Sequence, residues 1–314
     1  MRNINWKRMR YFLEVLKHES LRKAAAELNT SPSVVSRQVR LLEEDLGAAL
    51  FERTAKGIAP TEAARHLFSY AQACELQREH LRDRLHGAIQ GSVRVSVTEG
   101  FIETLMDEVM IDFLAKFPDV DISLHVCPAN EVVTQVLEEI AHIGLTYNPP
   151  VMPDIRFCAS MRQPVMLAVR PGHPLADMKR PIEMREAVSY PFSIMPDAFG
   201  LGQLVRLAAH AENVRLEPTF VANSLFALTR FARAGSGIAF LTEFAMIHEL
   251  RAGELVAVPI AQPLLQNAYA RALVKADRPM TRATSACLSH VVSGMSVFSE
   301  GPADFDAARL IHRA

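Results

Sequence analysis

The chain has 314 residues, 49% of them hydrophobic, and a formal net charge of −1 at pH 7. At about 100–200 residues per domain this length allows two or three domains, and the composition is that of a globular protein with more than one core. No apolar run approaches the roughly 20 residues of a membrane helix and charges interrupt the N-terminal apolar runs, so we expect a cytoplasmic protein without membrane span or signal peptide.

Charge is distributed unevenly along the sequence. Residues 1–60 contain 11 Lys and Arg against 7 Asp and Glu, whereas the remaining residues contain 23 against 28. A basic N-terminal segment followed by an acidic remainder is typical of a DNA-binding domain joined to a domain with another function. Many solvated helix faces carry a similar excess, so charge alone does not identify the function.

The cysteines give no sign of a metal site. Cys74, Cys127, Cys158 and Cys287 are far apart and form no CxxC pair. The spacing predicts neither a zinc site nor a disulfide framework. We therefore expect reduced, mostly buried thiols, with no metal and no cofactor.

The first 61 residues predict three helices and a short hairpin. Ser20 can cap the second helix, and Ser31 or its neighbour can cap the third. Pro32 is favourable in the first turn of the third helix, and Gly47 is a natural stop. The expected helices are 4–18, 21–28 and 31–46, and the expected two-stranded wing is 50–61.

The third helix carries the residues expected to contact double-stranded DNA. In a helix-turn-helix unit the second helix lies in the major groove, with its N-terminal residues at the base edges. Short hydroxyls allow close approach, Arg37 can chelate a guanine, and Arg40 is better placed for a phosphate. A polar, solvated helix face is the alternative. The expected contacts are Ser31, Pro32, Ser33, Ser36, Arg37 and Arg40, with Arg53 and Lys56 flanking the wing.

A long helical pattern follows over 62–89, with no glycine or proline before Gly87. Its apolar residues form a coiled-coil-like seam that Arg78 interrupts. Such a helix can pack on its own domain or pair with a second copy of the chain. We prefer self-association, because the helix is long and stands between two domains. The seam consists of Leu67, Ala71, Cys74, Leu81 and Leu85.

The hydrophobic period changes after Gly91, where strands and helices begin to alternate. The order strand, helix, strand, helix, strand predicts a parallel sheet with right-handed crossovers, and a second unit repeats this order. The expected strands are 92–99, 121–127, 142–147, 164–171, 190–196, 216–222, 237–241 and 268–276; the expected helices are one ending at Phe117, then 130–140, 199–212, 223–234 and 280–298.

These elements predict two α/β lobes joined by two extended crossings, near 158–164 and 263–269. Such an arrangement forms a clamshell. Ligands bind at the carboxyl ends of the strands, in the crevice between the lobes.

Two sequence runs near the N-terminus are characteristic of one protein family: AAAELNTSPSVVSRQVRLLEEDLG and LFERTAKGIAPTEAA. They resemble the DNA-binding domain of the LysR-type transcriptional regulators over about sixty residues, in order and without gaps. The segments VTEG, RPGHPLA and GSGIAFLTEFA agree more loosely. The resemblance implies an α/β fold class, with an N-terminal winged helix-turn-helix, a linker helix and a two-lobed effector domain shaped like a type II periplasmic binding protein.

On this resemblance the expected domains are a winged helix-turn-helix over 1–61, a dimerisation helix over 62–90, an effector-binding domain over 91–299 and a tail over 300–314. Lobe one would comprise 91–160 and 268–299, and lobe two 161–267. The implied function is sequence-specific transcription regulation modulated by a small-molecule effector. The implied partners are DNA, the effector, further copies of the chain in a dimer or homotetramer, and RNA polymerase.

In the resembling family the effector touches the first strand-to-helix turn, which here is Thr98, Glu99, Gly100 and Phe101. Backbone N–H groups at a helix N-terminus favour an anion, although Glu99 would oppose one unless it faces away. Taken alone, each expected contact is better explained as a cap or a core residue, and it is their convergence on one crevice that favours a binding site. Together they suggest a small, partly apolar molecule, and a carboxylate on it is the weaker hypothesis. The remaining expected contacts are Thr146, Asn148, Ser193, Met195, Phe199, Asn223, Ser224, Gly237 and Ile238.

The sequence departs from the family at three places. Gly144 stands where the third strand usually carries an acidic residue, so contacts there are expected to differ. Lys56 replaces a common arginine in the wing and should still serve electrostatically. Residues 300–314 extend past the usual final helix.

Two other classes of function suit parts of this sequence. The two lobes alone would suit a solute-carrier protein, but the DNA-binding head and the lack of a signal peptide argue against it. An enzyme on this scaffold would need an acid–base pair or nucleophile in the cleft, and no motif supplies one. His173 in RPGHPLA is better explained as a turn histidine than as a base, and Gly200–Gly202 and Gly235–Gly237 lack the third glycine of a dinucleotide site.

Overall fold

The computed structural model describes residues 4–54, 57–86, 89–178 and 180–299. The chain divides into two units, Met1–Arg82 and Asp83–Ala314. The predictions for Lys56, Gly87 and the tail 300–314 lie outside the described residues, as do those for the side chains of Arg53 and Leu85. No helix within the described ranges has both the length and the apolar character needed to cross a membrane.

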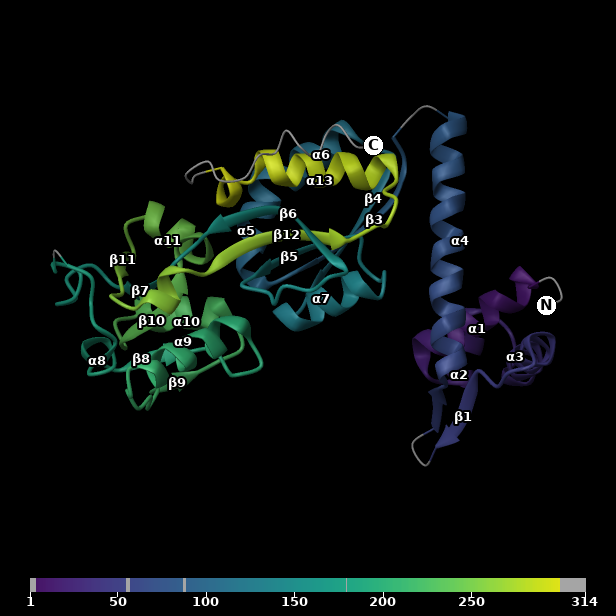
Figure 1. Ribbon diagram of the computed structural model, residues 1–314, viewed down its shortest axis with the longest axis horizontal. Helices are drawn as coiled ribbons and strands as arrows, with labels where there is room; N and C mark the ends of the chain where they lie inside the picture. The colour runs from purple at the N-terminus through teal and green to yellow at the C-terminus, as the bar shows by residue number, and fades with distance from the viewer. Residues whose placement is uncertain (1–3, 55–56, 87–88, 179, 300–314) are drawn as a thin grey trace. The chain divides into compact units, whose positions relative to one another are not determined.

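The first unit contains three short helices, a hairpin and most of a long helix (Figure 1). This matches the predicted order of elements. Strands β1 and β2 pair antiparallel, with Phe51 opposite Pro60. The elements are α1 (Trp6–His18), α2 (Leu21–Glu27), α3 (Pro32–Leu46), β1 (Phe51–Thr54), β2 (Gly57–Pro60) and α4 (Glu62–His86).

Side-chain caps begin these helices where the sequence predicts them. Ser20 Oγ accepts a hydrogen bond from the Lys23 amide, and Ser31 Oγ accepts one from the Val34 amide, each at 3.4 Å. Gly47 ends α3 with φ of 69°, a conformation that glycine adopts without steric cost. The caps fix the short turn between α2 and α3.

The first unit buries two apolar clusters, and α4 covers one of them. Leu67 and Ala71 pack with Met9, Phe12 and Leu42 from α1 and α3. Burying a side chain of this size stabilises the fold by about 1.5–3 kcal/mol. The first half of the predicted seam therefore packs on its own unit, whereas Leu81, further along α4, is 57% exposed.

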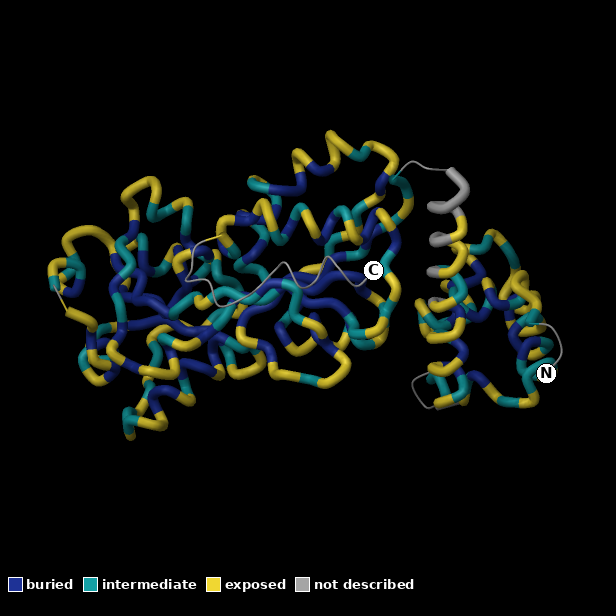
Figure 2. The backbone as a smooth tube through the Cα atoms, turned by 45° about the horizontal axis from the view of Figure 1, so that its top comes forward, coloured by how far each residue is buried: buried dark blue, intermediate teal, exposed yellow. Residues whose placement is uncertain are grey.

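The second unit contains two five-stranded sheets, which we call lobe one and lobe two (Figure 1). Figure 2 shows buried residues gathered in the interior of this unit. Lobe one has the order β4 (Val120–Val126), β3 (Gly91–Val97), β5 (Ile143–Tyr147), β12 (Tyr269–Lys275), β6 (Ile155–Arg162). Lobe two has the order β11 (Val256–Pro259), β7 (Val165–Val169), β10 (Ile238–Thr242), β8 (Phe192–Ile194), β9 (Phe220–Val221).

Helical segments connect these strands. A near-continuous helical stretch follows β3 and includes a π-helical turn. The segments are η1 (Glu99–Phe101), α5 (Ile102–Leu105), η2 (Met106–Met110), α6 (Ile111–Lys116), α7 (Ala129–Leu137), α8 (Met184–Ala187), α9 (Gly200–Ala211), α10 (Leu225–Arg233), η3 (Glu243–Met246), α11 (Ile247–Arg251), α12 (Pro263–Gln266), α13 (Arg282–Gly294) and η4 (Ser296–Phe298).

The prediction of parallel sheets is correct for six of the ten described strands of the second unit and wrong for the other four. Strands β3, β4 and β5 are parallel, as are β8, β9 and β10. Strands β12, β6, β7 and β11 run antiparallel to their neighbours. Both sheets are mixed because the chain passes between the lobes along strands: β6 leads directly towards β7, and β12 returns to lobe one.

The expected crossing at 158–164 is mostly strand, because β6 extends to Arg162. The two passages between the lobes lie side by side, since the Gln163 amide donates to the Ala268 carbonyl at 2.8 Å. The Gln163 side chain also donates to the Val297 carbonyl at 3.1 Å. These bonds tie the crossings to each other and to the end of lobe one.

Candidate functional site

The N-terminal turn of α3 presents a polar, exposed surface. Ser31, Ser33, Ser36 and Arg37 are exposed there, and Ser31 Oγ lies 2.9 Å from Ser33 Oγ. The opposite side of α3 is buried through Val35, Val39 and Leu42. The structure thus brings the predicted α3 residues together on one accessible side, with Pro32 and Arg40 also exposed.

The two arginines of α3 differ in their partners. Arg40 pairs with Glu44 one turn later, Nε to Oε1 at 3.3 Å, and both side chains are mostly exposed. Arg37 forms no ion pair with any residue that the structure describes. Val34 is 37% exposed beside these groups, and the sequence analysis did not select it. Its methyl groups are of the kind that contact thymine, and its position between Ser33 and Val35 was the available signal.

Contacts behind α3 hold it and the wing in place. Arg8 of α1 forms an ion pair with Asp45, and its guanidinium also donates to the Leu41 carbonyl at 3.4 Å. Glu43 Oε1 accepts from the Leu50 amide at 2.7 Å. These polar contacts fix the end of α3 to α1 and to the start of the hairpin.

A cavity of about 350 Å³ lies between the two lobes. Its wall comes from the segments that follow the carboxyl ends of β3, β4, β5, β8, β9 and β10. This is where parallel α/β sheets bind ligands, and the volume is within the usual range for small molecules. The lining is Thr98, Glu99, Gly100, Val126, Cys127, Pro128, Ala129 and Tyr147 from lobe one, and Met195, Phe199, Gly200, Leu201, Asn223, Leu225, Thr242 and Phe244 from lobe two.

Six of the predicted effector residues line this cavity: Thr98, Glu99, Gly100, Met195, Phe199 and Asn223. Asn148 lies instead on a wider hollow of about 780 Å³, together with Asp197, Arg206 and His210. Its backbone is left-handed, with φ of 49°, so the chain turns away after β5. Sequence adjacency to a strand end was therefore not sufficient to place Asn148.

Four further predicted residues lie in the strands or next to them and do not line the cavity. Thr146 is fully buried and its register partner is Arg271, so it points to the face of β5 opposite Tyr147. Ser193 is also buried and donates to the Ile238 carbonyl at 3.4 Å. Ile238 itself is fully buried in β10. At Gly237 an added Cβ would lie 2.1 Å from the Pro191 carbonyl oxygen, so this glycine permits a close backbone approach.

The pair Glu99 and Ser224 links the lobes. Glu99 accepts hydrogen bonds from Ser224 Oγ at 2.9 Å and from the Leu225 and Phe226 amides at 2.8 and 3.4 Å. The carboxylate therefore caps α10 of lobe two and is directed towards that helix. Ser224 does not line the cavity, because its hydroxyl is held by this cap.

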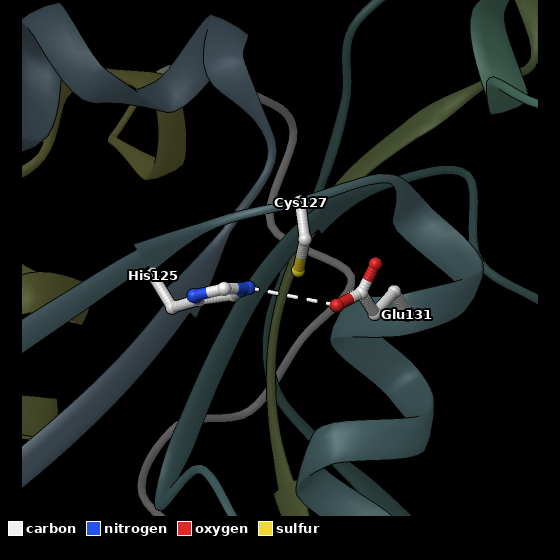
Figure 3. A group of neighbouring side chains, drawn as sticks. All are labelled: His125, Cys127 and Glu131. Atoms are coloured by element: carbon white, nitrogen blue, oxygen red, sulfur yellow. Dashed lines mark ion pairs between the residues drawn. The ribbon is translucent and has the colours of Figure 1, made fainter. Parts of the chain in front are cut away.

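Cys127 is a lining residue that the sequence analysis did not select, and it has two polar neighbours. It lies between His125 and Glu131, as Figure 3 shows. Burial, and then the nearby Glu131 carboxylate, raise the pKa of its thiol to about 11. The thiol is therefore protonated near neutral pH. All four cysteines are unpaired, and Cys127 and Cys287 are buried.

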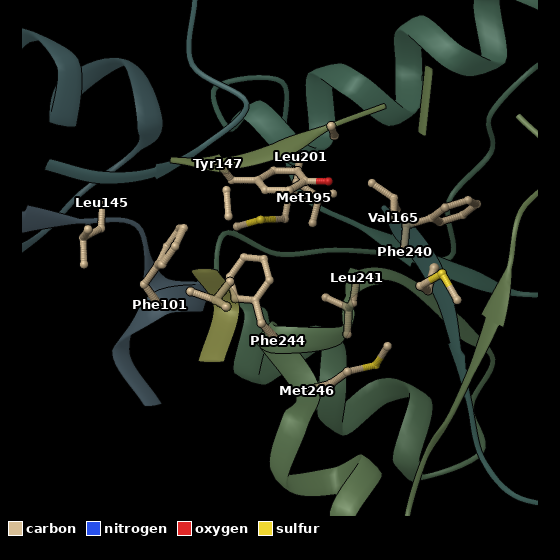
Figure 4. Close-up of a cluster of buried hydrophobic side chains, with 14 of the residues drawn as sticks. Phe101, Leu145, Tyr147, Val165, Met195, Leu201, Phe240, Leu241, Phe244 and Met246 are labelled. Atoms are coloured by element: carbon tan, nitrogen blue, oxygen red, sulfur yellow. The ribbon is translucent and has the colours of Figure 1, made fainter. Parts of the chain in front are cut away.

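Aromatic side chains form part of the cavity wall and support it from behind. Phe244 lies between Phe101 and Tyr147, with ring centroids 4.9 and 6.1 Å away (Figure 4). Tyr147 donates from its hydroxyl to the Gln163 carbonyl at 2.7 Å, and burial raises the pKa of that hydroxyl. Phe101 is fully buried behind Phe244, so it supports the wall and does not line the cavity.

Two helices begin at the cavity wall without a side-chain cap. Helix α7 begins after Pro128 and α9 after Phe199. The first N–H groups of a helix carry a partial positive charge and favour an anionic or hydrogen-bond-accepting group. The lining is otherwise mostly apolar, and its polar side chains are Thr98, Glu99, Cys127, Tyr147, Asn223 and Thr242.

His173 is a turn residue. Its Nδ1 accepts from the Leu175 amide at 3.2 Å, and its ring packs 4.9 Å from that of Tyr190. It does not line the cavity. The position agrees with the interpretation of a structural turn histidine.

Family comparison identifies both units. The LysR substrate binding domain model matches residues 86–296, and the model of the bacterial regulatory helix-turn-helix protein, lysR family, matches residues 6–65. The chain belongs to the LysR family of transcriptional regulators, with a helix-turn-helix DNA-binding domain and an effector-binding domain. The matched relatives are regulators, and the enzyme interpretation is set aside.

Individual relatives agree with this assignment. The RuBisCO operon transcriptional regulator of Allochromatium vinosum is 26% identical over 263 residues, which covers 82% of this chain and 86% of the relative. Full-length OxyR from Pseudomonas aeruginosa has a similar fold, with a TM-score of 0.72, 16% identity and coverage of 96% of this chain and 100% of that one. Full-length CbnR in complex with its target DNA gives a TM-score of 0.59 at 17% identity, covering 91% and 98%.

Proposed function

We propose that this regulator reads an operator through the N-terminal turn of α3 and that a small molecule in the interlobe cavity changes its effect on transcription. The observation that supports the effector site best is the origin of the cavity wall in both lobes. A ligand there contacts both lobes at once. It can therefore favour one lobe arrangement, provided that its affinity for the two arrangements differs.

In the DNA-binding unit the exposed residues have separate proposed roles. Arg37 reads a guanine edge, Val34 contacts a thymine methyl, and Ser31, Ser33 and Ser36 allow the backbone to approach the groove. Arg40, which already pairs with Glu44, contacts phosphate. Pro32 fixes the helix start, and Arg53 and Lys56 are proposed to contact the DNA backbone or minor groove.

The proposed effector is a small, partly apolar molecule with a hydrogen-bond-accepting group. Apolar side chains make up most of the lining, and Phe199, Leu201 and Phe244 offer large surfaces. The acceptor would face the uncapped starts of α7 and α9. Hydrogen bonds from Ser224 and the first α10 amides offset part of the negative charge of Glu99, which also lines the cavity.

The proposed assembly is a cytoplasmic homodimer that pairs through α4 and associates further into a tetramer on DNA. The exposed Leu81 supports this role, because its side chain is 57% exposed while Leu67 and Ala71, earlier in α4, pack on the first unit's core. Paired protomers place two α3 helices in successive major grooves, about 34–36 Å apart. The arrangement of the bound dimers then determines access of RNA polymerase.

Ligand-induced thermal stabilisation tests the effector site. The full-length protein is screened against a panel of small metabolites, and each ligand that raises the Tm is titrated into the variants Asn223→Ala and Thr98→Ala. Both residues line the cavity, so we expect the ligand's Kd to rise at least about fivefold, a loss of roughly 1 kcal/mol for a hydrogen bond. The matched control is Asn148→Ala, which lies outside the cavity. Equal effects in Asn223→Ala and Asn148→Ala would reject this location.

A further inference from the structure

A cluster of three potential metal ligands adjoins the cavity. His125 lies in β4, Cys127 follows that strand, and Glu131 lies in the first turn of α7 (Figure 3). Their ligand atoms all lie within 4.8 Å of one another. His125 Nε2 and Glu131 Oε1 are 3.5 Å apart. The strand end and the helix start thus bring an imidazole, a thiol and a carboxylate to one point.

We propose that His125, Cys127 and Glu131 bind Zn²⁺ at the edge of the cavity. Imidazole, thiolate and carboxylate are the ligand types that zinc takes in proteins, at bond lengths of about 2.0–2.3 Å. In a tetrahedral site these bonds place neighbouring ligand atoms roughly 3.3–3.7 Å apart. The observed nitrogen–oxygen distance of 3.5 Å already has this spacing.

The exposure of His125 and Glu131 leaves room for the adjustment that brings their ligand atoms closer to the Cys127 sulfur. The His125 and Glu131 side chains are 57% and 49% exposed, so both can rotate and the site is open to solvent. Cys127 is only 8% exposed and is fixed between β4 and α7. Binding of the metal replaces the proton of the Cys127 thiol by a sulfur–zinc bond and releases that proton to solvent.

A second layer of contacts orients the carboxylate. Gln135 Nε2 donates to Glu131 Oε1 at 3.0 Å, and Ser96 Oγ donates to the Gln135 side-chain oxygen. Such outer contacts commonly orient metal ligands and tune their affinity. Ser96 is buried in β3, so the chain of bonds runs from the sheet interior to the proposed ligand.

Three protein ligands leave one tetrahedral position open. Because Cys127 also lines the cavity, zinc bound to it would form part of the cavity wall. The cysteine spacing did not predict this site, since its ligands are three different residue types at a strand–helix junction. The proposal does not depend on the proposed effector, because metal binding is measured without DNA or any other ligand.

The experiment titrates Co²⁺, and then Zn²⁺, into the reduced, tag-free, full-length protein. We expect one Co²⁺ per chain, with a thiolate-to-cobalt charge-transfer band that one equivalent of Zn²⁺ abolishes. Cys127→Ser should lose the band. His125→Gln and Glu131→Gln should weaken Co²⁺ binding by about tenfold or more.

Two control variants match the ligands. Cys158→Ser alters another unpaired cysteine. His66→Gln alters an exposed histidine that pairs with Glu62 at 3.7 Å and belongs to no three-ligand cluster among the residues that the structure describes. Both should bind Co²⁺ like the parent protein. Absence of the thiolate band in the parent protein, or its persistence in Cys127→Ser, would overturn the proposal. If Cys127→Ser does not fold, the exposed His125→Gln decides, and unchanged Co²⁺ affinity in that variant rejects the site.

Discussion

At the scale of single residues, Glu99 connects the lobes. Its carboxylate in lobe one accepts three hydrogen bonds at the start of α10 in lobe two. A carboxylate at a helix N-terminus satisfies free amide groups and interacts favourably with the helix dipole. The same residue lines the cavity, so a bound effector would lie beside this connection.

Replacing Glu99 by Ala should lower the free energy of unfolding of the second unit by about 1–2 kcal/mol, because the α10 amides lose their cap. Urea-induced unfolding followed by circular dichroism measures the change. Glu217→Ala is the matched control, since Glu217 is exposed and its ion pair is with the nearby, exposed Arg215. An equally stable Glu99→Ala protein would show that the cap contributes nothing to lobe association.

His142 should make stability depend on pH. Burial, and then the charges of Arg94 and Arg278, lower its pKa from 6.5 to about 3 in the folded chain. Between these values the unfolded chain binds a proton that the folded chain does not, so stability is complete above pH 6.5 and falls as the pH falls below it.

From about pH 7.5 to about pH 5 this residue should cost roughly 2 kcal/mol of stability, at 1.36 kcal/mol per pKa unit. Urea unfolding of the parent protein and of His142→Gln at both pH values checks this. The variant should lose about 2 kcal/mol less than the parent over that interval. Parallel losses in the two proteins would mean that His142 does not titrate on unfolding.

At the scale of elements, β5 has no room for a side chain at Gly144, where the family usually carries an acidic residue. A Cβ there would lie 2.7 Å from Leu273 Cδ1 and 2.9 Å from Val132 Cγ1. Both neighbours are fully buried. Large apolar side chains from β12 and α7 thus occupy the space that an acidic residue would need.

Gly144→Ala should therefore destabilise the protein by about 1–3 kcal/mol through overpacking, and Gly144→Asp by more, because it also buries a charge. Thermal unfolding measures both. Gly200→Ala serves as the control, since its added methyl would meet its nearest neighbour at 3.4 Å, an ordinary contact distance. A Gly144→Asp protein as stable as the parent would contradict this packing.

The predicted elements agree with the structure where local signals are strong. The caps Ser20 and Ser31 and the stop at Gly47 fixed the helix boundaries of the first unit. The edge strands β6 and β11 were missed, because β6 carries charges and no clear alternation and β11 is short and ends in proline. Pro218 similarly lies in the part of the predicted strand 216–222 that is not strand.

The residues of the candidate cavity could likewise be predicted only where a local sequence signal marked them. Strand ends were predictable from the alternation of elements, so Thr98, Met195 and Asn223 were placed near it. Which face a residue occupies depends on register, and this excluded Thr146. Cys127 and Phe244 were missed because an isolated cysteine and a phenylalanine resemble ordinary core residues, and only the tertiary fold brings them to the wall.

At the scale of the whole molecule, one chain carries two separate units. The first exposes a polar helix turn suited to base edges, and the second encloses a cavity between two lobes. Phosphate contacts by the basic head would supply affinity that falls steeply with salt, whereas Arg37 would supply sequence preference.

The most direct test is affinity selection of sheared genomic DNA on the purified protein, with sequencing of the recovered fragments. We expect an interrupted dyad with half-sites about one helical turn apart. Arg37→Ala should bind the selected site about 1–3 kcal/mol more weakly, with little change on random DNA. No enrichment of any sequence over Arg37→Ala, or an equal loss on selected and random DNA, would contradict the claim that this helix reads sequence.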